Sequence, residues 1–398
     1  MPPLDACSHR PPCPGCTRFG DPAPAPEAIA ALTRLCKDHG LDAPTIHTTS
    51  GAGHRHRARL AVRGRARSPK IGLFQADSHR IVDTPSCAVH HPAINEAAAH
   101  LKQAIRATGI APYADGPHRG ALRYAQFVVE RGTGRVQVVL VGNGDTPDVL
   151  GALPEAFADG MGDRLQGLFF NAQPDRTNVI LGPTTVRLHG EAAVRERLGG
   201  VDVFFPPTAF GQNHLPLFER AVERIHALVP QGATVFEAYC GVGAIGLGLL
   251  ARGLVRFNER SPAGLEGLAR GLEARPASER ARAERFEGAA GERLDGLEGA
   301  DLVIVDPPRK GLDPPLRAAL AAQPPRRLVY LACGLPALLA ELPTLLAGGR
   351  MRLSGVEIFD FFPFTGHVET LVWLDRDGEP SDPPPGAASA PDERKRTT

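Results

Sequence analysis

The sequence F-E-A-Y-C-G-V-G-A-I-G at residues 236–246 ends an apolar run and begins a glycine-rich turn. A strand followed by such a turn is typical of cofactor sites, because Gly241 and Gly243 let the backbone pass close to a ligand. Alone, the turn leaves dinucleotide binding open as a rival. Glu259 closes the next apolar strand, where a carboxylate can accept hydrogen bonds from both ribose hydroxyls. Together these features favour S-adenosylmethionine as the cofactor.

A helix that ends at residue 252 is expected directly after this turn, and the alternation of strand and helix continues on both sides of it. A helical pattern at 215–228 precedes it, and D-L-V-I-V-D at 301–306 and R-L-V-Y-L-A at 327–332 follow as continuous apolar runs. Such runs are expected of parallel strands that are buried on both faces. The pattern predicts a doubly wound α/β sheet, Rossmann-like and S-adenosylmethionine-dependent, over 206–376. The polar, proline-rich tail at 377–398 is expected to be disordered.

A different pattern precedes the α/β region. Short β-like runs separated by Gly, Pro and Asp, interrupted by a helical stretch at 91–107 and a few others, predict an α+β central domain over 46–205. Helical apolar spacing ends at Gly40, so the segment 21–45 is expected to form a helix that packs on the α/β domain. Residues 1–20 form a compact motif rich in Cys and Pro.

Composition restricts the class of protein. The chain has 398 residues, of which 42% are apolar, so two domains are expected. Its formal net charge is +1, so no global field indicates a nucleic-acid partner. Charge is uneven, however, because residues 51–80 hold seven Arg and Lys70 against the single acid Asp77. This stretch is either a solvated strand face or a phosphate-contacting surface. No signal pattern or membrane-length apolar run is present, which predicts a soluble cytoplasmic protein.

A thiol and two carboxylates occur in order near the end of the α/β region. Asp306 opens D-P-P-R-K-G at 306–311, Cys333 ends Y-L-A-C, and Glu369 follows F-P-F-T-G-H-V. These groups are the components of covalent catalysis with separate proton removal: a nucleophile, a positioning acid and a base. An acid such as Glu369 inside the apolar run V-E-T-L-V-W-L would be costly without a role.

Together these pieces resemble the RNA uracil carbon-5 methyltransferase family, which forms 5-methyluridine. The resemblance covers nearly the whole chain. Its motifs stand in the family's order and spacing: A-F-G-Q at 209–212, E-A-Y-C-G-V-G at 237–243, Glu259, D-P-P-R-K-G, Y-L-A-C and F-P-F-T-G-H-V-E.

The resemblance implies a role for each motif. Cys333 would add to carbon 6 of uracil, which makes carbon 5 nucleophilic toward the sulfonium methyl group, and Glu369 would then remove the carbon-5 proton. Asp306 would hold the uracil edge near the thiol. The methyl donor would be contacted by Gln212, Tyr239, Gly241, Gly243, Glu259 and Asp306.

Four cysteines outside this set are candidate metal ligands. Cys7, Cys13 and Cys16 are spaced C-x5-C-x2-C, and Cys87 is the candidate for a fourth ligand. Spacing alone leaves [4Fe-4S] and zinc open, and a radical S-adenosylmethionine site is disfavoured because its first spacing is three residues. The resemblance favours a [4Fe-4S] cluster with a structural or RNA-positioning role. Cys36 and Cys240 are interpreted as packed residues.

The chain departs from the family pattern at several points. His214 stands where the family has Asn, Gly334 follows the nucleophile in place of another Asn, and Ala244 replaces a polar residue of the cofactor turn. The acid that the family carries in a D-A-like pair after the third strand is not evident in F-E-G-A-A at 286–290. These departures affect the cofactor contacts more than the nucleophile or the base.

The iron–sulfur motif and the lack of an extra β-barrel module at the N-terminus resemble the subgroup that modifies a hairpin loop of 23S rRNA. We therefore expect 23S rRNA as the partner and a monomeric protein, with tRNA as the alternative substrate. Two other classes remain open: a non-catalytic RNA-binding protein with a methyltransferase fold, and an amino-group methyltransferase. The latter would give Cys333 no function.

Overall fold

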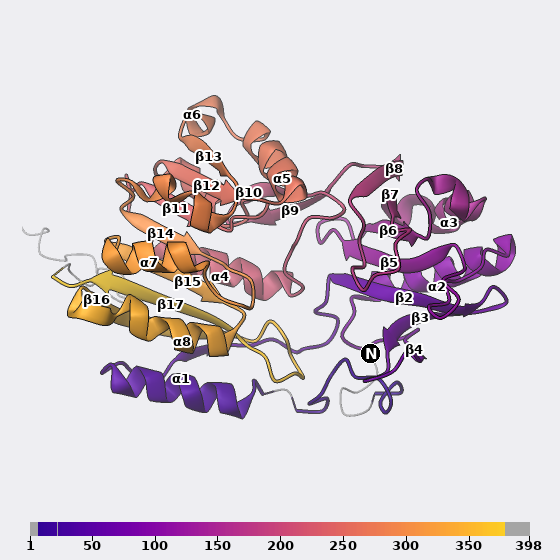
Figure 1. Ribbon diagram of the computed structural model, residues 1–398, viewed down its shortest axis with the longest axis horizontal. Helices are drawn as coiled ribbons and strands as arrows, with labels where there is room; N and C mark the ends of the chain where they lie inside the picture. Colours follow the sequence, from indigo (N-terminus) through magenta and orange to yellow (C-terminus); the bar gives the residue numbers. More distant parts are fainter. Residues whose placement is uncertain (1–6, 22, 379–398) are drawn as a thin grey trace, which may run out of the picture.

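The computed structural model describes residues 7–21 and 23–378, so most of the predicted tail lies outside the described residues. Two large β-sheets lie side by side, an eight-stranded one on the left and a seven-stranded one on the right (Figure 1). No helix in these two ranges is both long and apolar enough to cross a membrane.

The eight-stranded sheet has the order β1-β16-β17-β15-β14-β11-β12-β13. All its neighbouring strands are parallel except β17, which runs antiparallel to both β15 and β16. The strands are β1 (Thr45–His47), β11 (Val235–Ala238), β12 (Val255–Glu259), β13 (Ala283–Glu287), β14 (Leu302–Val305), β15 (Arg327–Ala332), β16 (Met351–Phe359) and β17 (Glu369–Arg376).

Helices cover both faces of this sheet, as the alternation of strands and helices predicts. The helices α4 (Leu215–Ala227) and α5 (Pro262–Glu273) share one apolar core with the sheet. On the opposite face lie α1 (Pro26–Asp38), α7 (Pro314–Ala322) and α8 (Leu335–Leu345). Successive residues of β14, such as Val303 and Ile304, point to opposite cores, because the side chains of a strand alternate between its two faces.

One element differs from its predicted form. The helix expected directly after the glycine turn is a 3₁₀ stretch, Gly246–Ala251. A Cβ at Gly246 would stand 2.2 Å from the Glu237 carboxylate and 2.6 Å from the Phe257 ring, so the backbone presses directly on the sheet there. Close backbone packing and several glycines, which disfavour the α-helix, account for the tighter turn.

The seven-stranded sheet has the order β4-β3-β2-β5-β6-β7-β8 and is antiparallel except between β6 and β7. Helices α2 (Pro92–Thr108) and α3 (Leu153–Met161) pack on one of its faces. Its strands are β2 (Arg57–Arg65), β3 (Ser68–Phe74), β4 (Ile81–Asp83), β5 (Leu122–Val129), β6 (Val136–Gly142), β7 (Leu165–Ala172) and β8 (Thr184–Gly190).

Several short elements complete the fold besides the two large sheets and their helices. The hairpin of β9 (Val194–Leu198) and β10 (Val201–Phe205) contributes its apolar side chains to the core that contains α4 and α5. The remaining short elements are α6 (Ala277–Arg280) and the 3₁₀ turns Pro147–Leu150, Gly162–Arg164, Ala290–Glu292, Leu294–Leu297 and Ala347–Gly349.

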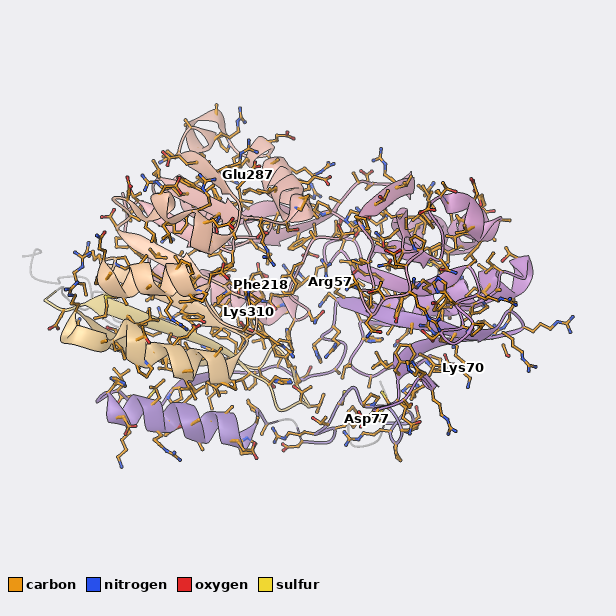
Figure 2. All side chains as sticks on the ribbon, in the orientation of Figure 1. Arg57, Lys70, Asp77, Phe218, Glu287 and Lys310 are labelled. Carbon is orange, nitrogen blue, oxygen red and sulfur yellow. The ribbon has the colours of Figure 1, made fainter. Side chains whose placement is uncertain are left out.

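The arginines of β2 lie on the face that α2 and α3 leave uncovered. Alternate residues of a strand share a face, and Leu60 and Val62 point to the helices. Arg57 lies between the two sheets (Figure 2), where its Nη1 donates to the Ala209 carbonyl at 2.8 Å. Arg63, farther along the strand, is only 6% exposed. The face is therefore not a simply solvated one.

Candidate active site

A pocket of about 540 Å³ opens at the carboxyl ends of the central parallel strands. It lies where the strand order reverses, between β11 and β14, which is where open α/β sheets bind their ligands. Of the predicted catalytic and cofactor residues, its lining includes Gln212, Tyr239, Gly241, Glu259, Asp306 and Cys333 but not Gly243 or Glu369. The lining also includes residues to which the sequence assigned no role, among them Phe210, Asn258, Arg309 and Phe362.

The cofactor turn is built from residues with positive φ. Tyr239, Gly241 and Gly243 have φ values of 61°, 57° and 77°. A tyrosine rarely adopts this conformation, and it persists only where its surroundings hold it. Here the Tyr239 hydroxyl accepts a hydrogen bond from the Asp313 N–H at 2.9 Å, and burial raises its pKa to about 12. The ring therefore stays neutral and ties the turn to the segment after the acidic loop.

Glu259 stands at the end of β12 and faces the turn. Its carboxylate accepts hydrogen bonds from the N–H groups of Gly241 at 2.9 Å, Arg260 at 2.9 Å and Ser261 at 2.5 Å. Two carboxylate oxygens offer about four acceptor positions, so capacity remains for a ribose hydroxyl. The backbone contacts fix the direction of the carboxylate before any ligand arrives.

Asp306 follows β14 directly and is half-buried. Burial raises the pKa of its carboxyl group to about 7, and a hydrogen bond with the Gln212 side chain partly offsets the rise. Gln212 therefore connects the loop before α4 to the acidic loop after β14. Both protonation states of Asp306 are accessible near neutral pH, which suits a group that must hold a polar base edge.

Strand pairing brings Cys333 and Glu369 together. Ala332, the last residue of β15, pairs with Thr370 in antiparallel β17, so the next step of the ladder sets Cys333 beside Glu369. Burial raises the pKa of the Cys333 thiol to about 11, and the charges of Glu369 and Asp306 add to the rise, while Arg309 opposes it. The thiol is thus held mainly in its neutral form in the free protein.

Glu369 is fully buried, and neither of its carboxylate oxygens has a hydrogen-bond partner within the described part of the chain. Burial and the nearby charge of Asp306 raise its pKa well above the ordinary value, with Arg309 opposing. A buried carboxyl group without partners is destabilising by a few kcal/mol. Such a cost indicates a functional group.

Two departures from the family pattern have structural counterparts. A Cβ at position 334 would lie 2.4 Å from the Arg309 carbonyl oxygen, so Gly334 lets the acidic loop rest against the residue after the thiol. His214 caps α4, because its Nδ1 accepts from the Leu217 N–H at 3.3 Å, and its Nε2 lies 2.8 Å from the Thr49 hydroxyl. A side chain of the Asn type also caps helices in this way.

Phe210 is the most conspicuous residue that the sequence did not single out. Its ring is 73% exposed although it lines the mouth of the pocket. Asn258 is buried beneath the pocket and donates to the Phe286 carbonyl at 2.8 Å and the Gly288 carbonyl at 3.1 Å. The motif A-F-G-Q contains Phe210, but only the fold reveals that it is exposed.

The four N-terminal candidate ligands line a second, smaller cavity of about 80 Å³. Cys7, Cys13, Cys16 and Cys87 all border it, and burial raises the pKa of Cys16 to about 11, with Cys87, Cys13 and Cys7 contributing to the rise. Among the described residues no group of three His, Cys, Asp or Glu is close enough to hold a metal ion. Cys36 is buried on α1, apart from this cavity.

The two groups that four cysteines can hold, a zinc ion and a [4Fe-4S] cluster, differ in size. Thiolates around one zinc ion lie about 3.8 Å apart, which leaves no space between them. Four cysteines that border one cavity are the residue types that hold a larger group such as a [4Fe-4S] cluster. The residue types therefore fit the cluster, whereas the described residues form no group of ligands close enough together to hold a metal ion.

Known proteins resemble both the sequence and the fold. A profile of the family described as tRNA (uracil-5-)-methyltransferase matches residues 277–377. A protein of Protochlamydia amoebophila described as an uncharacterised RNA methyltransferase is 32% identical over 380 residues, which are 93% of this chain and 97% of that protein. This chain belongs to the RNA uracil carbon-5 methyltransferase family. A second RNA methyltransferase described as uncharacterised, from Gloeobacter violaceus, is 34% identical over 84% of this chain and 72% of its own length.

A solved structure supports the same family. The tRNA (uracil-54, C5)-methyltransferase of Pyrococcus abyssi, in complex with S-adenosyl-L-homocysteine, superposes with a TM-score of 0.73 at 26% identity, over 87% of this chain and 83% of that one. The chain is therefore an RNA uracil carbon-5 methyltransferase with an S-adenosylmethionine-dependent α/β fold. The predictions of family, of enzyme class and of S-adenosylmethionine as the methyl donor are confirmed, whereas the [4Fe-4S] cluster stays a prediction.

We expect Gly334→Ala to lower the turnover number at least roughly tenfold, because displacing a positioned group by about 1 Å can cost a factor of a hundred. The added methyl group would push the Arg309 carbonyl, and with it Asp306, away from the thiol. Steady-state kinetics and circular dichroism measure activity and folding. Gly366→Ala is the matched control, because a Cβ there meets nothing within 4 Å. Equal activity of the two variants would contradict the close-approach explanation.

Asp306→Asn should lower the pKa of Cys333, because it removes one of the negative charges that raise it, whereas Arg309→Ala should raise that pKa. Alkylation of Cys333 by iodoacetamide follows the thiolate fraction. Its rate between pH 7 and pH 11, measured by mass spectrometry of the Cys333 peptide, should rise at a lower pH in the first variant and at a higher pH in the second. Unchanged profiles in both variants would refute the electrostatic coupling.

Proposed function

We propose that this enzyme forms 5-methyluridine in 23S rRNA through a covalent adduct between Cys333 and carbon 6 of the target uracil. One observation carries the proposal: a thiol and an unpartnered, buried carboxyl group lie at neighbouring strand ends, beside a second carboxyl group. A simple base-positioning site would need no thiol at this place.

The proposed steps conserve atoms and charge. The Cys333 thiolate adds to carbon 6, and the electron pair of the 5,6 double bond moves to give an enolate. Bound S-adenosylmethionine would supply an electrophilic methyl group: as carbon 5 of the enolate bonds to the methyl carbon, the bond from that carbon to the sulfonium sulfur breaks and neutral S-adenosylhomocysteine leaves. The Glu369 carboxylate then takes the proton from carbon 5, the double bond reforms, and the thiolate leaves carbon 6. The products are 5-methyluridine, S-adenosylhomocysteine and the regenerated thiolate, with the proton on Glu369.

The remaining predicted residues receive positioning roles. We assign Asp306 to the uracil edge and to orientation of the methyl donor, aided by its hydrogen bond with Gln212. Glu259 and Tyr239, with Gly241 and Gly243 of the turn, would hold the methyl donor. Because these glycines have no side chain, the donor could approach the backbone closely at this place.

The raised pKa of Glu369 agrees with its proposed role. A carboxylate in water is too weak a base for a carbon-bound proton, and burial strengthens it. Because Glu369 is fully buried and makes no hydrogen bond with any described residue, its basicity is not reduced by donors. Its neighbour across the strand pair is the nucleophile, so a uracil bonded to Cys333 carries carbon 5 toward it.

The target uridine must leave its stack before a thiol can reach carbon 6, which favours a loop of the RNA. The exposed ring of Phe210 at the pocket mouth offers a surface on which a base can stack. The four-cysteine set resembles that of ribosomal members and supports 23S rRNA. A tRNA substrate is the second candidate, because the Pyrococcus abyssi protein is a tRNA (uracil-54, C5)-methyltransferase. Mapping 5-methyluridine in rRNA and tRNA from cells without this protein distinguishes the two.

RNA that contains 5-fluorouridine should trap the enzyme, because fluorine at carbon 5 cannot leave as a proton does. We expect a denaturation-resistant protein–RNA adduct with the wild type and with Cys240→Ala, a control that removes a neighbouring thiol, but none with Cys333→Ala. Glu369→Gln should accumulate a methylated adduct on ordinary RNA, since the last proton stays in place. Gel electrophoresis and mass spectrometry measure both. Free product released by Glu369→Gln at the normal rate would refute its role as base.

We further propose that Cys7, Cys13, Cys16 and Cys87 hold a [4Fe-4S] cluster. The cluster would tie the N-terminal motif to the seven-stranded sheet, and methyl transfer needs no electron from it. Protein purified without oxygen should contain about four iron atoms and absorb broadly in the visible range. Cys87→Ser should lose most of this iron, whereas Cys36→Ser, the control, should keep it. Stoichiometric zinc in place of iron would contradict the proposal.

A further inference from the structure

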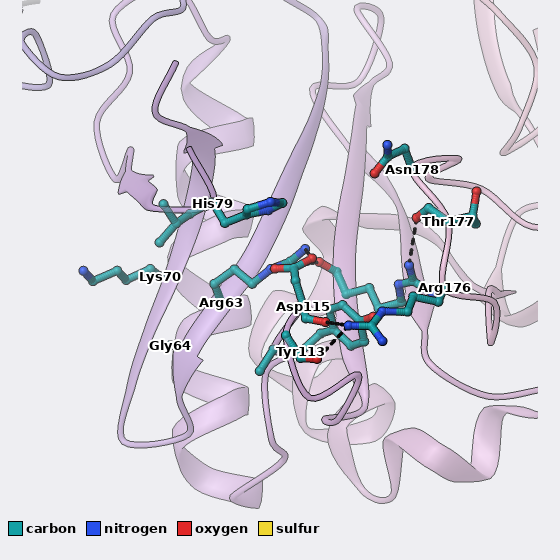
Figure 3. Close-up of a pocket in the computed structure, with 13 residues that line it drawn as sticks. Arg63, Gly64, Lys70, His79, Tyr113, Asp115, Arg176, Thr177 and Asn178 are labelled. Carbon is teal, nitrogen blue, oxygen red and sulfur yellow. Dashed lines mark hydrogen bonds and ion pairs between the residues drawn. The ribbon is translucent and has the colours of Figure 1, made fainter. Parts of the chain in front are cut away.

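The largest pocket described in this fold is not the catalytic one. It has a volume of about 850 Å³ and lies at the far end of the seven-stranded sheet, between the β2–β3 hairpin and the loops around residues 113–116 and 176–178 (Figure 3). Its lining contains four permanent cations, Arg63, Lys70, Arg123 and Arg176, and one carboxylate, Asp115. Such an excess of positive charge in a hollow attracts anions.

The floor of the pocket is rigid. Arg63 makes a two-pronged ion pair with Asp115, at 2.7 Å and 2.8 Å, and its guanidinium lies 5.1 Å from the ring centres of Phe74, Tyr113 and Tyr124. Asp115 therefore neutralises a buried cation and leaves the charges of the rim uncompensated. A floor fixed in this way can present the rim groups in constant positions.

Two arrangements of charge would be eased by an anion in the pocket. Lys70 pairs directly with Arg63 across β2 and β3, on the same face, and like charges in such a pair repel. Arg123 is 3% exposed and donates to backbone carbonyls, yet its Nε has no hydrogen-bond partner among residues 7–21 and 23–378. Both features store unfavourable energy that a bound phosphate would relieve.

The rim offers groups for more than a phosphate. Lys70 and Asn178 make no hydrogen bond with any described residue, and they stand on opposite walls, together with His79 on the first wall (Figure 3). Arg176 donates only to the carbonyls of Asp115 and Gly116. An Asn amide both donates and accepts, as the edge of a nucleobase requires. Cations with an unpaired amide across a wide hollow suit a nucleotide better than a lone anion.

We propose that this pocket binds one nucleotide of the substrate RNA, with its base at Asn178, its own phosphate on Arg176 and the adjoining phosphate toward Lys70 on the opposite wall. The site is separate from the target uridine, because the six residue steps along β2 from Arg57 to Arg63 span about 20 Å. Arg57 touches the loop that carries Gln212, whereas Arg63 forms the floor of the pocket. One strand thus connects a second RNA contact to the catalytic pocket.

The double variant Lys70→Ala/Arg176→Ala tests the phosphate contacts. The matched control Arg106→Ala/Arg187→Ala removes two exposed cations from the same sheet and its helix, outside the pocket. Binding is measured by filter retention with unmodified 23S rRNA and tRNA transcripts, and methylation with whichever transcript the wild type modifies. We expect roughly tenfold weaker binding, a salt slope reduced by about 1.4, and a raised KM with unchanged kcat for the pocket variant. An equal loss in the control would overturn the proposal.

Asn178→Trp tests the nucleotide itself, since it fills the pocket without changing its charge. Binding should weaken roughly tenfold, as when a base loses its place. A surface that attracts RNA by charge alone would leave the affinity of this variant unchanged, and that result would refute a nucleotide site. The binding measurements need no methylation, so they stand apart from the proposed covalent mechanism and from the choice between 23S rRNA and tRNA.

Discussion

The antiparallel pairing of β17 with β15 is the constraint on which the catalytic arrangement depends. In a wholly parallel sheet the residue that begins one strand lies at the opposite edge from the residue that ends its neighbour. Because β17 runs the other way, its first residue, Glu369, meets the residue after β15, Cys333. The sheet therefore joins two residues that are far apart in the sequence, and it does so with buried backbone hydrogen bonds that neither side chain can disturb.

This pairing places the Glu369 carboxyl group beside Cys333, whose side chain lines the same pocket as Asp306. Asp306 raises the pKa of both Cys333 and Glu369, Glu369 raises that of Cys333, and Arg309 opposes both rises. The raised pKa values favour the neutral forms of the Cys333 thiol and of the Glu369 carboxyl group in the free protein. Under the proposed mechanism, substrate binding must supply polar contacts that favour ionisation of both groups, which would tie activation of the nucleophile to the presence of the correct base. This arrangement lowers the stability of the fold, because neither carboxylate oxygen of Glu369 has a hydrogen-bond partner among the described residues.

The sequence patterns predicted the residues of the site better than they predicted how loops and hairpins pack. The strand-and-helix rhythm and the motifs around Glu259, Asp306 and Cys333 led to the α/β fold and to the pocket in which those residues meet. The contact between Gly334 and the Arg309 carbonyl was not predictable, because it depends on how two loops from different strands approach. The boundary at residues 205 and 206 remains a prediction, since the β9–β10 hairpin precedes it and yet joins the core of α4 and α5. Periodicity cannot tell which of two cores receives a hairpin.

The arginines of β2 show why a charge pattern alone leaves function undecided. Their alternation predicted one basic face, but each arginine has a different partner: Arg57 holds the Ala209 carbonyl, Arg59 holds Gln126, and Arg63 holds Asp115. Burial lowers the pKa of Arg57 to about 10, yet it stays charged at neutral pH beside the loop of the catalytic pocket. A strand that is anchored at one end to the catalytic loop and at the other to a cationic hollow is stiff. RNA that touches both ends would therefore be held at a fixed distance from the thiol, so that shape as well as sequence selects the uridine.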